Sequence, residues 1–223
     1  QMNEFILINK YLKSLSQNNH GAFNLEDDIF FDEKRGFAIS VDTYSEGVHF
    51  VGFDPNNFLK KIIRASLSDL YCKGIKPKTY FLSLSINKKL SKKSWFAKIK
   101  KILNSEQKKF NISLGGGDTI NSTKFIVTII VLGYSKIKPV LRNGCALNDD
   151  IYVTGNIGDS FLGLKIIKKK ANFGKSNNFL KKKYFEPDLP IKISPHLSKI
   201  ASASIDISDG LGQDLKHICD ASN

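Results

Sequence analysis

The segment KFIVTIIVLGY at 124–134 constrains the fold of this chain most strongly. It is too short for a membrane span and is apolar at nearly every position, whereas a surface strand alternates between apolar and polar residues. A short continuous run of this kind is typical of a strand whose two faces are both buried in an α/β protein. The segment therefore predicts a strand inside a sheet that is covered by other elements.

The rest of the chain alternates between the two periodicities expected for helices and strands. Helices are predicted at 3–15, 56–72, 92–109, 159–170 and 190–202 and from about Asp209 onward, and strands near 36–42, 79–86, 114–119, 149–155 and 203–207. The stretch 136–148 has no strong period and contains Pro139 and Gly144, which is typical of a linker. The pattern predicts two α/β domains, over 1–137 and 149–223, the second of them incomplete because the last helix is followed by no closing element.

The net charge of +13 raises the question of a nucleic-acid surface. Of the 34 basic residues only three are arginines, and base readout and phosphate clamps favour the planar guanidinium group. The lysines of 88–109 fall on a predicted helix whose other face is apolar, which is typical of a solvated face. We therefore expect no nucleic-acid partner.

No apolar run approaches the roughly 18 residues of a membrane span, so we expect no membrane partner either. The three cysteines, Cys72, Cys145 and Cys219, are far apart and form no C-x-x-C pair. This spacing favours reduced thiols in a cytoplasmic protein over a disulfide framework or a zinc site.

Several aspartates stand beside Gly, Ser or Thr at the ends of predicted elements, where loops commonly build sites. They are Asp28, Asp42, Asp69, Asp118, Asp206 and Asp209. Carboxylate oxygens are the ligands that Mg²⁺ takes in phosphoryl-transfer sites, together with phosphate oxygens and water. A single aspartate of this kind is more often a helix cap or a turn residue, but the whole set indicates a site for hard divalent cations.

The usual nucleotide motifs are absent from the sequence. Gly174-Lys175-Ser176 resembles the end of a P-loop, but Lys169 stands where that motif requires its first glycine. The glycines at 115–117 allow two interpretations: their amides approach a phosphate while Asp118 holds its metal ion, or the run forms a tight turn.

Longer segments resemble thiamine-monophosphate kinases. DTYSEGVHF at 42–50 is similar to a hallmark segment of that family, and SLSDLYCKGIKP at 66–77 resembles its segment N-L-S-D-L-A-A-M-G-A-x-P. GGDT at 116–119, DDIYVTGNIGDS at 149–160 and SIDISDGLGQDL at 204–215 follow in the family's order. The resemblance covers nearly the whole chain.

The resemblance implies the two-domain fold of the aminoimidazole-ribonucleotide-synthetase superfamily, a homodimer, and Mg²⁺-dependent transfer of phosphate from ATP to thiamine monophosphate. By position it implies magnesium ligands at Asp28, Ser40, Asp42, Asp69, Asp118, Asp206 and Asp209, with Asp42 and Asp118 the residues most directly involved in transfer. It also implies ATP contacts at Gly117, Asp118, Arg142 and Ser208. His49 matches a position that contacts thiamine monophosphate; without the resemblance, a packed histidine would be the simpler interpretation, as a surface arginine would be for Arg142.

The implied chemistry fits an all-aspartate site, because a phosphate monoester is largely anionic near neutral pH and needs no strong general base. Repulsion between two phosphates is the obstacle, and bound cations would reduce it.

The chain departs from the family pattern at Glu26, Ile29 and Val41 and at 120–122, and relatives continue beyond the position of Asn223. Two alternatives remain open at this point: another ATP-using enzyme of the superfamily, or a nucleotide-binding remnant without turnover.

Overall fold

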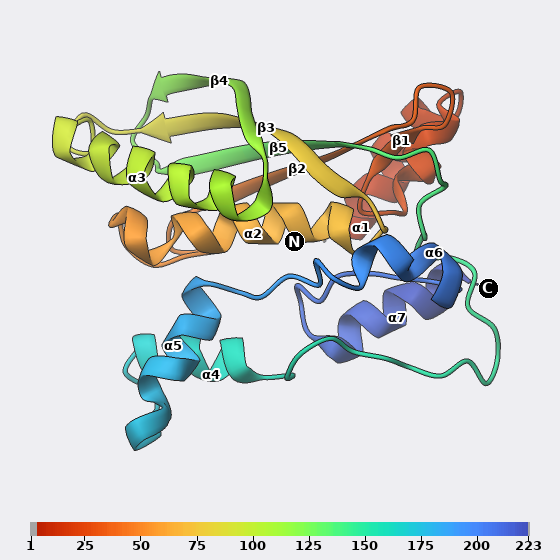
Figure 1. Ribbon diagram of the computed structural model, residues 1–223. Helices are drawn as coiled ribbons and strands as arrows, with labels where there is room; N and C mark the ends of the chain where they lie inside the picture. Colours follow the sequence, from red (N-terminus) through yellow and green to blue (C-terminus); the bar gives the residue numbers. More distant parts are fainter. Residues whose placement is uncertain (1–3, 223) are drawn as a thin grey trace.

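A five-stranded sheet in the order β1-β2-β5-β3-β4 is the frame of the molecule (Figure 1). The structure is a computed structural model and describes residues 4–222. The strands are β1 (Phe30–Asp32), β2 (Phe37–Ser45), β3 (Lys76–Ile86), β4 (Ser113–Asn121) and β5 (Ile126–Tyr134). β2 and β3 both pair antiparallel with β5, and β4 pairs parallel with β3. The predicted α/β class is confirmed, and the segment at 124–134 forms the central strand.

Two helices cover one face of the sheet (Figure 1). α2 (Leu59–Tyr71) buries Ile62, Ile63 and Leu67, and α3 (Lys93–Phe110) buries Ile99 and Ile102; both sets recur at helical spacing. They pack against the inward side chains of β5 in one continuous apolar core. The lysines of α3 lie on its outer side, as the sequence predicts.

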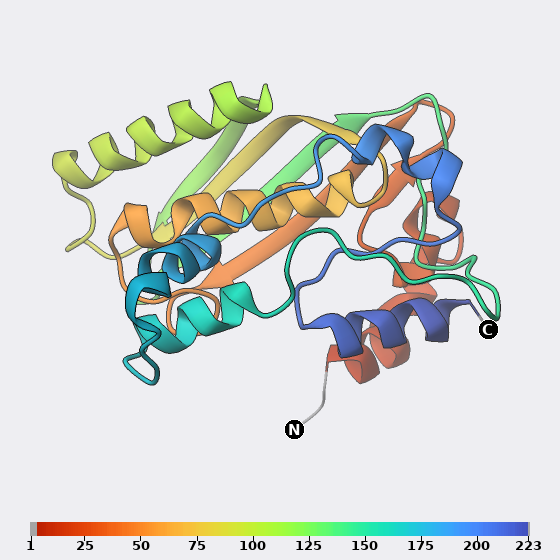
Figure 2. The same cartoon turned by 60° about the horizontal axis from the view of Figure 1, so that its bottom comes forward.

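The opposite face of the sheet has no helix over it within residues 4–222 (Figures 1 and 2). Accordingly, β5 alternates between buried and half-buried side chains. The prediction that both its faces are buried is therefore wrong for this chain on its own. Apolar composition indicates that burial of a strand face is favourable, but it does not indicate what covers that face.

After β5, the residues that the structure describes form only helices and coil (Figure 2). The helices of this part are α4 (Asp159–Ile167), α5 (Asn177–Phe185), α6 (Leu197–Ile200) and α7 (Leu211–Ala221). The N-terminal segment, predicted as a helix at 3–15, continues from α1 (Glu4–Leu7) as a π-helix (Ile8–Leu12) and a 3₁₀ helix (Lys13–Ser16). α4 and α5 pack closely, since a Cβ on Gly163 would lie 2.2 Å from the Leu180 carbonyl oxygen.

Two predicted strands are absent from the residues that the structure describes. The segments 149–155 and 203–207 are coil, and Ile151 and Tyr152 are exposed. An alternating pattern becomes a strand only beside another strand, and neither segment has one here. The helix predicted at 190–202 shortens to a 3₁₀ turn and α6, because Pro190 and Pro195 lack the amide proton that a longer helix needs.

The sequence reasoning also missed two elements, β1 and α5. β1 has only three residues, too few to show a period. α5 lies in a lysine-rich stretch whose weak apolar stripe consists of Leu180 and Tyr184. No helix in the part of the chain that the structure describes is both long and apolar enough to cross a membrane.

Candidate active site

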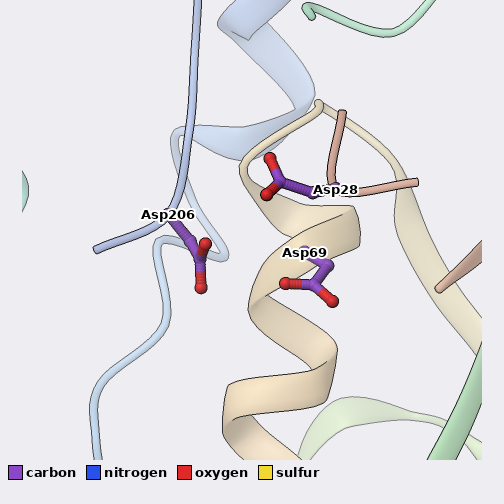
Figure 3. Close-up of side chains that lie close together, drawn as sticks. All are labelled: Asp28, Asp69 and Asp206. Atoms are coloured by element: carbon purple, nitrogen blue, oxygen red, sulfur yellow. The ribbon is translucent and has the colours of Figure 1, made fainter. Parts of the chain in front are cut away.

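Three aspartates from distant parts of the chain meet beside the C-terminal half of α2. Asp28 comes from the loop before β1, Asp69 from α2, and Asp206 from the coil before α7 (Figure 3). One carboxylate oxygen from each lies within 4.8 Å of the other two. This spacing suits a shared divalent cation, since Mg²⁺ binds carboxylate oxygens at about 2.0–2.1 Å.

Hydroxyl groups orient two of these carboxylates. Ser40, on the helix-facing side of β2, donates to Asp69 Oδ2. Ser68, one residue before Asp69, donates to Asp206 Oδ2 at 2.6 Å. Ser40 was predicted as a metal-site residue; the structure places its hydroxyl on a predicted metal ligand.

The electrostatics of Asp69 and Asp206 indicate a shortage of positive charge. Burial, followed by the charges of Asp42 and Asp206, raises the pKa of Asp69 well above its usual value. Burial, followed by the nearby charge of Asp28, raises the pKa of Asp206 to about 6. Clustered carboxylates that resist ionisation are stabilised in their charged form by a bound cation.

Asp28 is in a different environment. Burial acts to raise its pKa, but Lys73 and Arg142 outweigh burial, and the pKa of Asp28 is lowered. Lys73 Nζ lies 2.7 Å from Asp28 Oδ2 and 3.1 Å from Asp27 Oδ1, while Arg142 contacts Asp28 Oδ1. Sequence reasoning missed Lys73; the available signal was a lysine at the position where the similar family segment N-L-S-D-L-A-A-M-G-A-x-P has an uncharged methionine.

Asp42 lies near the cluster, on the same face of β2 as Ser40. Its Oδ2 accepts a hydrogen bond from the Tyr44 hydroxyl at 2.9 Å, and that hydroxyl also contacts Ser66 Oγ at 2.9 Å. The charge of Asp42 acts on both Asp69 and Asp206. The structure therefore brings Asp42 next to the three-aspartate group.

Asp118 is not brought into this group. It lies on the exposed edge strand β4, paired with Ser83 of β3. The strand order puts β4 three strand spacings, roughly 14 Å, from β2. Gly117 beside it is explained by packing, because a Cβ there would lie 1.8 Å from the Leu82 carbonyl oxygen.

Ser208 and Asp209 form a loop before α7, and Asp214 holds that loop. The buried Asp214 Oδ2 accepts from the backbone amides of Ser208, Asp209 and Gly210 at 3.0, 3.2 and 3.0 Å. Ser208 and Asp209 themselves are exposed. Asp214 was missed as a site residue, although it stands in the segment SIDISDGLGQDL.

Arg142 and His49 are the remaining residues for which the resemblance implies ligand contacts. Within residues 4–222 the buried Nε of Arg142 has no hydrogen-bond partner, which leaves one donor for a ligand. A cavity of about 260 Å³, lined in part by His20, Asp27 and Arg142, gives access to this side. His49 is exposed; its Nδ1 accepts from the Ser45 amide at 3.0 Å and its ring packs edge-on against Tyr44.

Comparison with known proteins connects this geometry to a family. Residues 25–135 match the family model described as AIR synthase related protein, N-terminal domain. A thiamine-monophosphate kinase of Buchnera aphidicola subsp. Schizaphis graminum is 36% identical over 226 residues, covering 98% of this chain and 69% of the relative.

Solved structures agree with the sequence match. The structure of AaThiL complexed with AMPPCP and TMP superimposes with a TM-score of 0.88 at 27% identity, covering all of this chain and 72% of that one. The thiamine monophosphate kinase from Aquifex aeolicus gives a TM-score of 0.85 at 27% identity, over 99% of this chain and 72% of that one. With its sequence matched almost end to end, this chain belongs to the thiamine-monophosphate kinase family.

Proposed function

We propose that this protein transfers the terminal phosphoryl group of ATP to thiamine monophosphate, giving thiamine diphosphate. The observation that carries the proposal is the convergence of Asp28, Asp69 and Asp206 in a chain of this family. A kinase acting on a phosphate monoester needs positive charge between two anions more than it needs a general base.

The carboxylates fit magnesium, and we propose Asp28, Asp69 and Asp206, with Asp42 beside them, as its binding residues. Bound Mg²⁺ would neutralise the phosphate oxygens and align donor and acceptor for in-line transfer. Ser40 and Ser68 orient the carboxylates through their hydroxyl groups.

Arg142 and Ser208 are proposed to contact ATP. The half-buried guanidinium of Arg142 can donate to a phosphate oxygen, and the loop at Ser208 is held in place by Asp214. Gly117 is proposed as a backbone contact to ATP, and the exposed His49 as a contact to thiamine monophosphate. Asp209 completes the proposed magnesium ligands on the same loop as Ser208.

Asp118 is proposed to serve a metal ion at a position separate from the three-aspartate group. Its distance from β2 within one chain supports this assignment. Asp118→Asn should lower turnover at least about 100-fold while leaving Mn²⁺ binding without nucleotide unchanged. A parallel loss of Mn²⁺ binding would show that Asp118 belongs to the same group.

The direct test is a phosphoryl-transfer assay on the purified protein. The chain is incubated with ATP, Mg²⁺ and thiamine monophosphate, and thiamine diphosphate is quantified by chromatography. Asp69→Asn should lower its formation at least about 100-fold, and the exposed Asp150→Asn serves as the matched control. Calorimetry that detects ATP–Mg²⁺ binding while no thiamine diphosphate forms would instead support a nucleotide-binding protein without turnover.

A homodimer is proposed through the face of the sheet that has no helix over it. That face and the edge strand beside it expose large apolar side chains at Val41, Phe81, Leu114, Ile120 and Tyr134. Exposed apolar patches of this kind mark association surfaces. Light scattering on the protein and on Val41→Lys should report a dimer and a monomer, respectively; monomeric wild-type protein would contradict the proposal.

A cytoplasmic location is proposed because Cys72, Cys145 and Cys219 are all free thiols. The two-domain division at 137–149 is likewise a proposal, supported by the absence of any helix or strand over residues 135–158.

A further inference from the structure

Lys73 is a lysine with no exposed side-chain surface, located just after α2. Its Nζ lies 2.7 Å from Asp28 Oδ2 and 3.1 Å from Asp27 Oδ1, and it donates to the Ser204 carbonyl oxygen at 2.6 Å. An ammonium group has three donors, and three oxygen atoms surround this one. The charge of Lys73 is therefore fixed in place.

Because it is fully enclosed, Lys73 cannot touch a nucleotide or an acceptor in this conformation. Its influence on the site is through charge and position. The segment N-L-S-D-L-A-A-M-G-A-x-P, which 66–77 resembles, has an uncharged methionine at this position. The buried positive charge is thus a departure of this chain from that pattern.

This charge divides the three-aspartate group into two unequal sides. Both oxygens of Asp28 face cationic side chains, Lys73 at Oδ2 and Arg142 at Oδ1. Asp69 and Asp206 receive hydrogen bonds from serine hydroxyls and form no ion pair in the part of the chain that the structure describes. Among the described residues, the Asp69–Asp206 side is therefore the side of the group without an ion pair.

We propose that Lys73 is a built-in cation of this site, whose ammonium group pairs with the carboxylates of Asp27 and Asp28 in place of a metal ion. In the nucleotide-free protein, divalent cations are then held mainly by Asp69 and Asp206. The protein binds them with lower affinity, or binds fewer of them, than it would without the lysine. The contact with Ser204, two residues before Asp206, also makes Lys73 a positioning residue for that carboxylate. The inference rests on the proposed metal-dependent function and deepens it.

The test is Mn²⁺ binding to the cation-free protein without nucleotide, measured by calorimetry and by the electron paramagnetic resonance signal of free Mn²⁺. Lys73→Met should bind Mn²⁺ at least about tenfold more tightly, or bind one additional ion, because a like charge a few ångströms from the metal has been removed. Mn²⁺ should also raise its melting temperature more than that of the unsubstituted protein.

Lys60→Met is the matched control. Lys60 Nζ lies 2.8 Å from Glu186 Oε1, and this ion pair is not part of the three-aspartate group. Removing Lys60 should therefore leave Mn²⁺ binding unchanged. Lys73→Gln is the second variant if Lys73→Met does not fold: it removes the charge but keeps a donor for Ser204, and the same gain in Mn²⁺ binding is expected.

Equal Mn²⁺ affinity and ion number in the unsubstituted and charge-free proteins would overturn the role of Lys73 while leaving the kinase proposal intact. Absence of Mn²⁺ binding in all of them would overturn both that role and the metal assignment. Loss of the proposed function itself would appear separately, as failure to form thiamine diphosphate.

Discussion

The region up to β5 and the region after it are held together by different forces. In the first, a continuous core of large apolar side chains fills the space between the sheet and the helices α2 and α3. In the second, Ile166, Leu180 and Tyr184 are the only large apolar side chains that are buried among the described residues of 149–222. The first region is stabilised by packing, and the second depends on its contacts with the first.

Many of those contacts are polar. Arg64 on α2 pairs with Glu106 on α3 and donates to the Pro187 carbonyl oxygen at 3.2 Å. Lys60 pairs with Glu186, and Ser68 donates to Asp206. The chain between α5 and α6 runs along α2 as a result (Figure 2). One carboxylate of the proposed site thus comes from the region without a core of its own, so the site depends on these contacts.

The largest effect is expected from removing Arg64, which forms a buried ion pair with Glu106 inside the first region and also contacts Pro187 and Glu186 of the second. Arg64 and Glu106 are each only 3% exposed, and Arg64→Met leaves the Glu106 charge buried without its partner. The free energy of unfolding should fall by about 3–5 kcal/mol, measured by urea denaturation. Lys98→Met, which removes an exposed ion pair with Asp54, should cost less than about 1 kcal/mol. Similar costs for both substitutions would contradict the importance of this buried arginine.

The second prediction compares the loss of stability caused by a large-to-alanine substitution in each of the two regions. Ile129→Ala opens a cavity in the core and should lower the free energy of unfolding by about 2–5 kcal/mol. Leu180→Ala should mainly increase hydrogen exchange in α4 and α5, with a change of under about 1 kcal/mol in global unfolding. Equal global effects would show that both regions unfold as one unit.

A third prediction concerns pH. The folded pKa of Asp206 is about 6, above its unfolded value, so the folded protein holds this proton more tightly. The associated stability is complete below about pH 4 and is lost as the pH rises through about 6. Asp206→Asn should therefore stabilise the cation-free protein by about 1–3 kcal/mol at pH 7.5 and by little at pH 4.

Melting curves in a chelator at the two pH values measure this difference, with Asp150→Asn as the control. Addition of Mg²⁺ at pH 7.5 should reduce the advantage of the variant, because the cation stabilises the ionised carboxylate. A benefit that is the same at both pH values would disprove the electrostatic explanation.

The smallest effect is expected from a hydrogen bond inside the first region. Tyr44→Phe removes the hydroxyl that contacts Asp42 and Ser66 and should cost about 0.5–1.5 kcal/mol. Denaturation by urea is again the measurement. A cost above that of Arg64→Met would show that this hydrogen bond contributes more to stability than the buried arginine that connects the two regions.

The sequence predicted the first region well, because its elements carry their own signals. The helices at 56–72 and 92–109 show a helical apolar stripe, and the strand at 124–134 is apolar at nearly every position. The second region was predicted less well, because the segments 149–155 and 203–207 have the pattern of strands but no neighbouring strand among the described residues. Strand formation depends on a partner that a local pattern does not contain.

At the site, the sequence by itself determined which side chains bear oxygen ligands and which family the chain resembles. Only the tertiary structure decided that Asp28, Asp69 and Asp206 meet, that Asp118 does not join them within one chain, and that Lys73 is enclosed between Asp27, Asp28 and Ser204. The physical reason is the separation along the chain over which each kind of interaction acts. Periodicity and capping act over a few residues, whereas the charges that set the properties of this site come from segments tens to more than a hundred residues apart and act only once packing has brought them within a few ångströms.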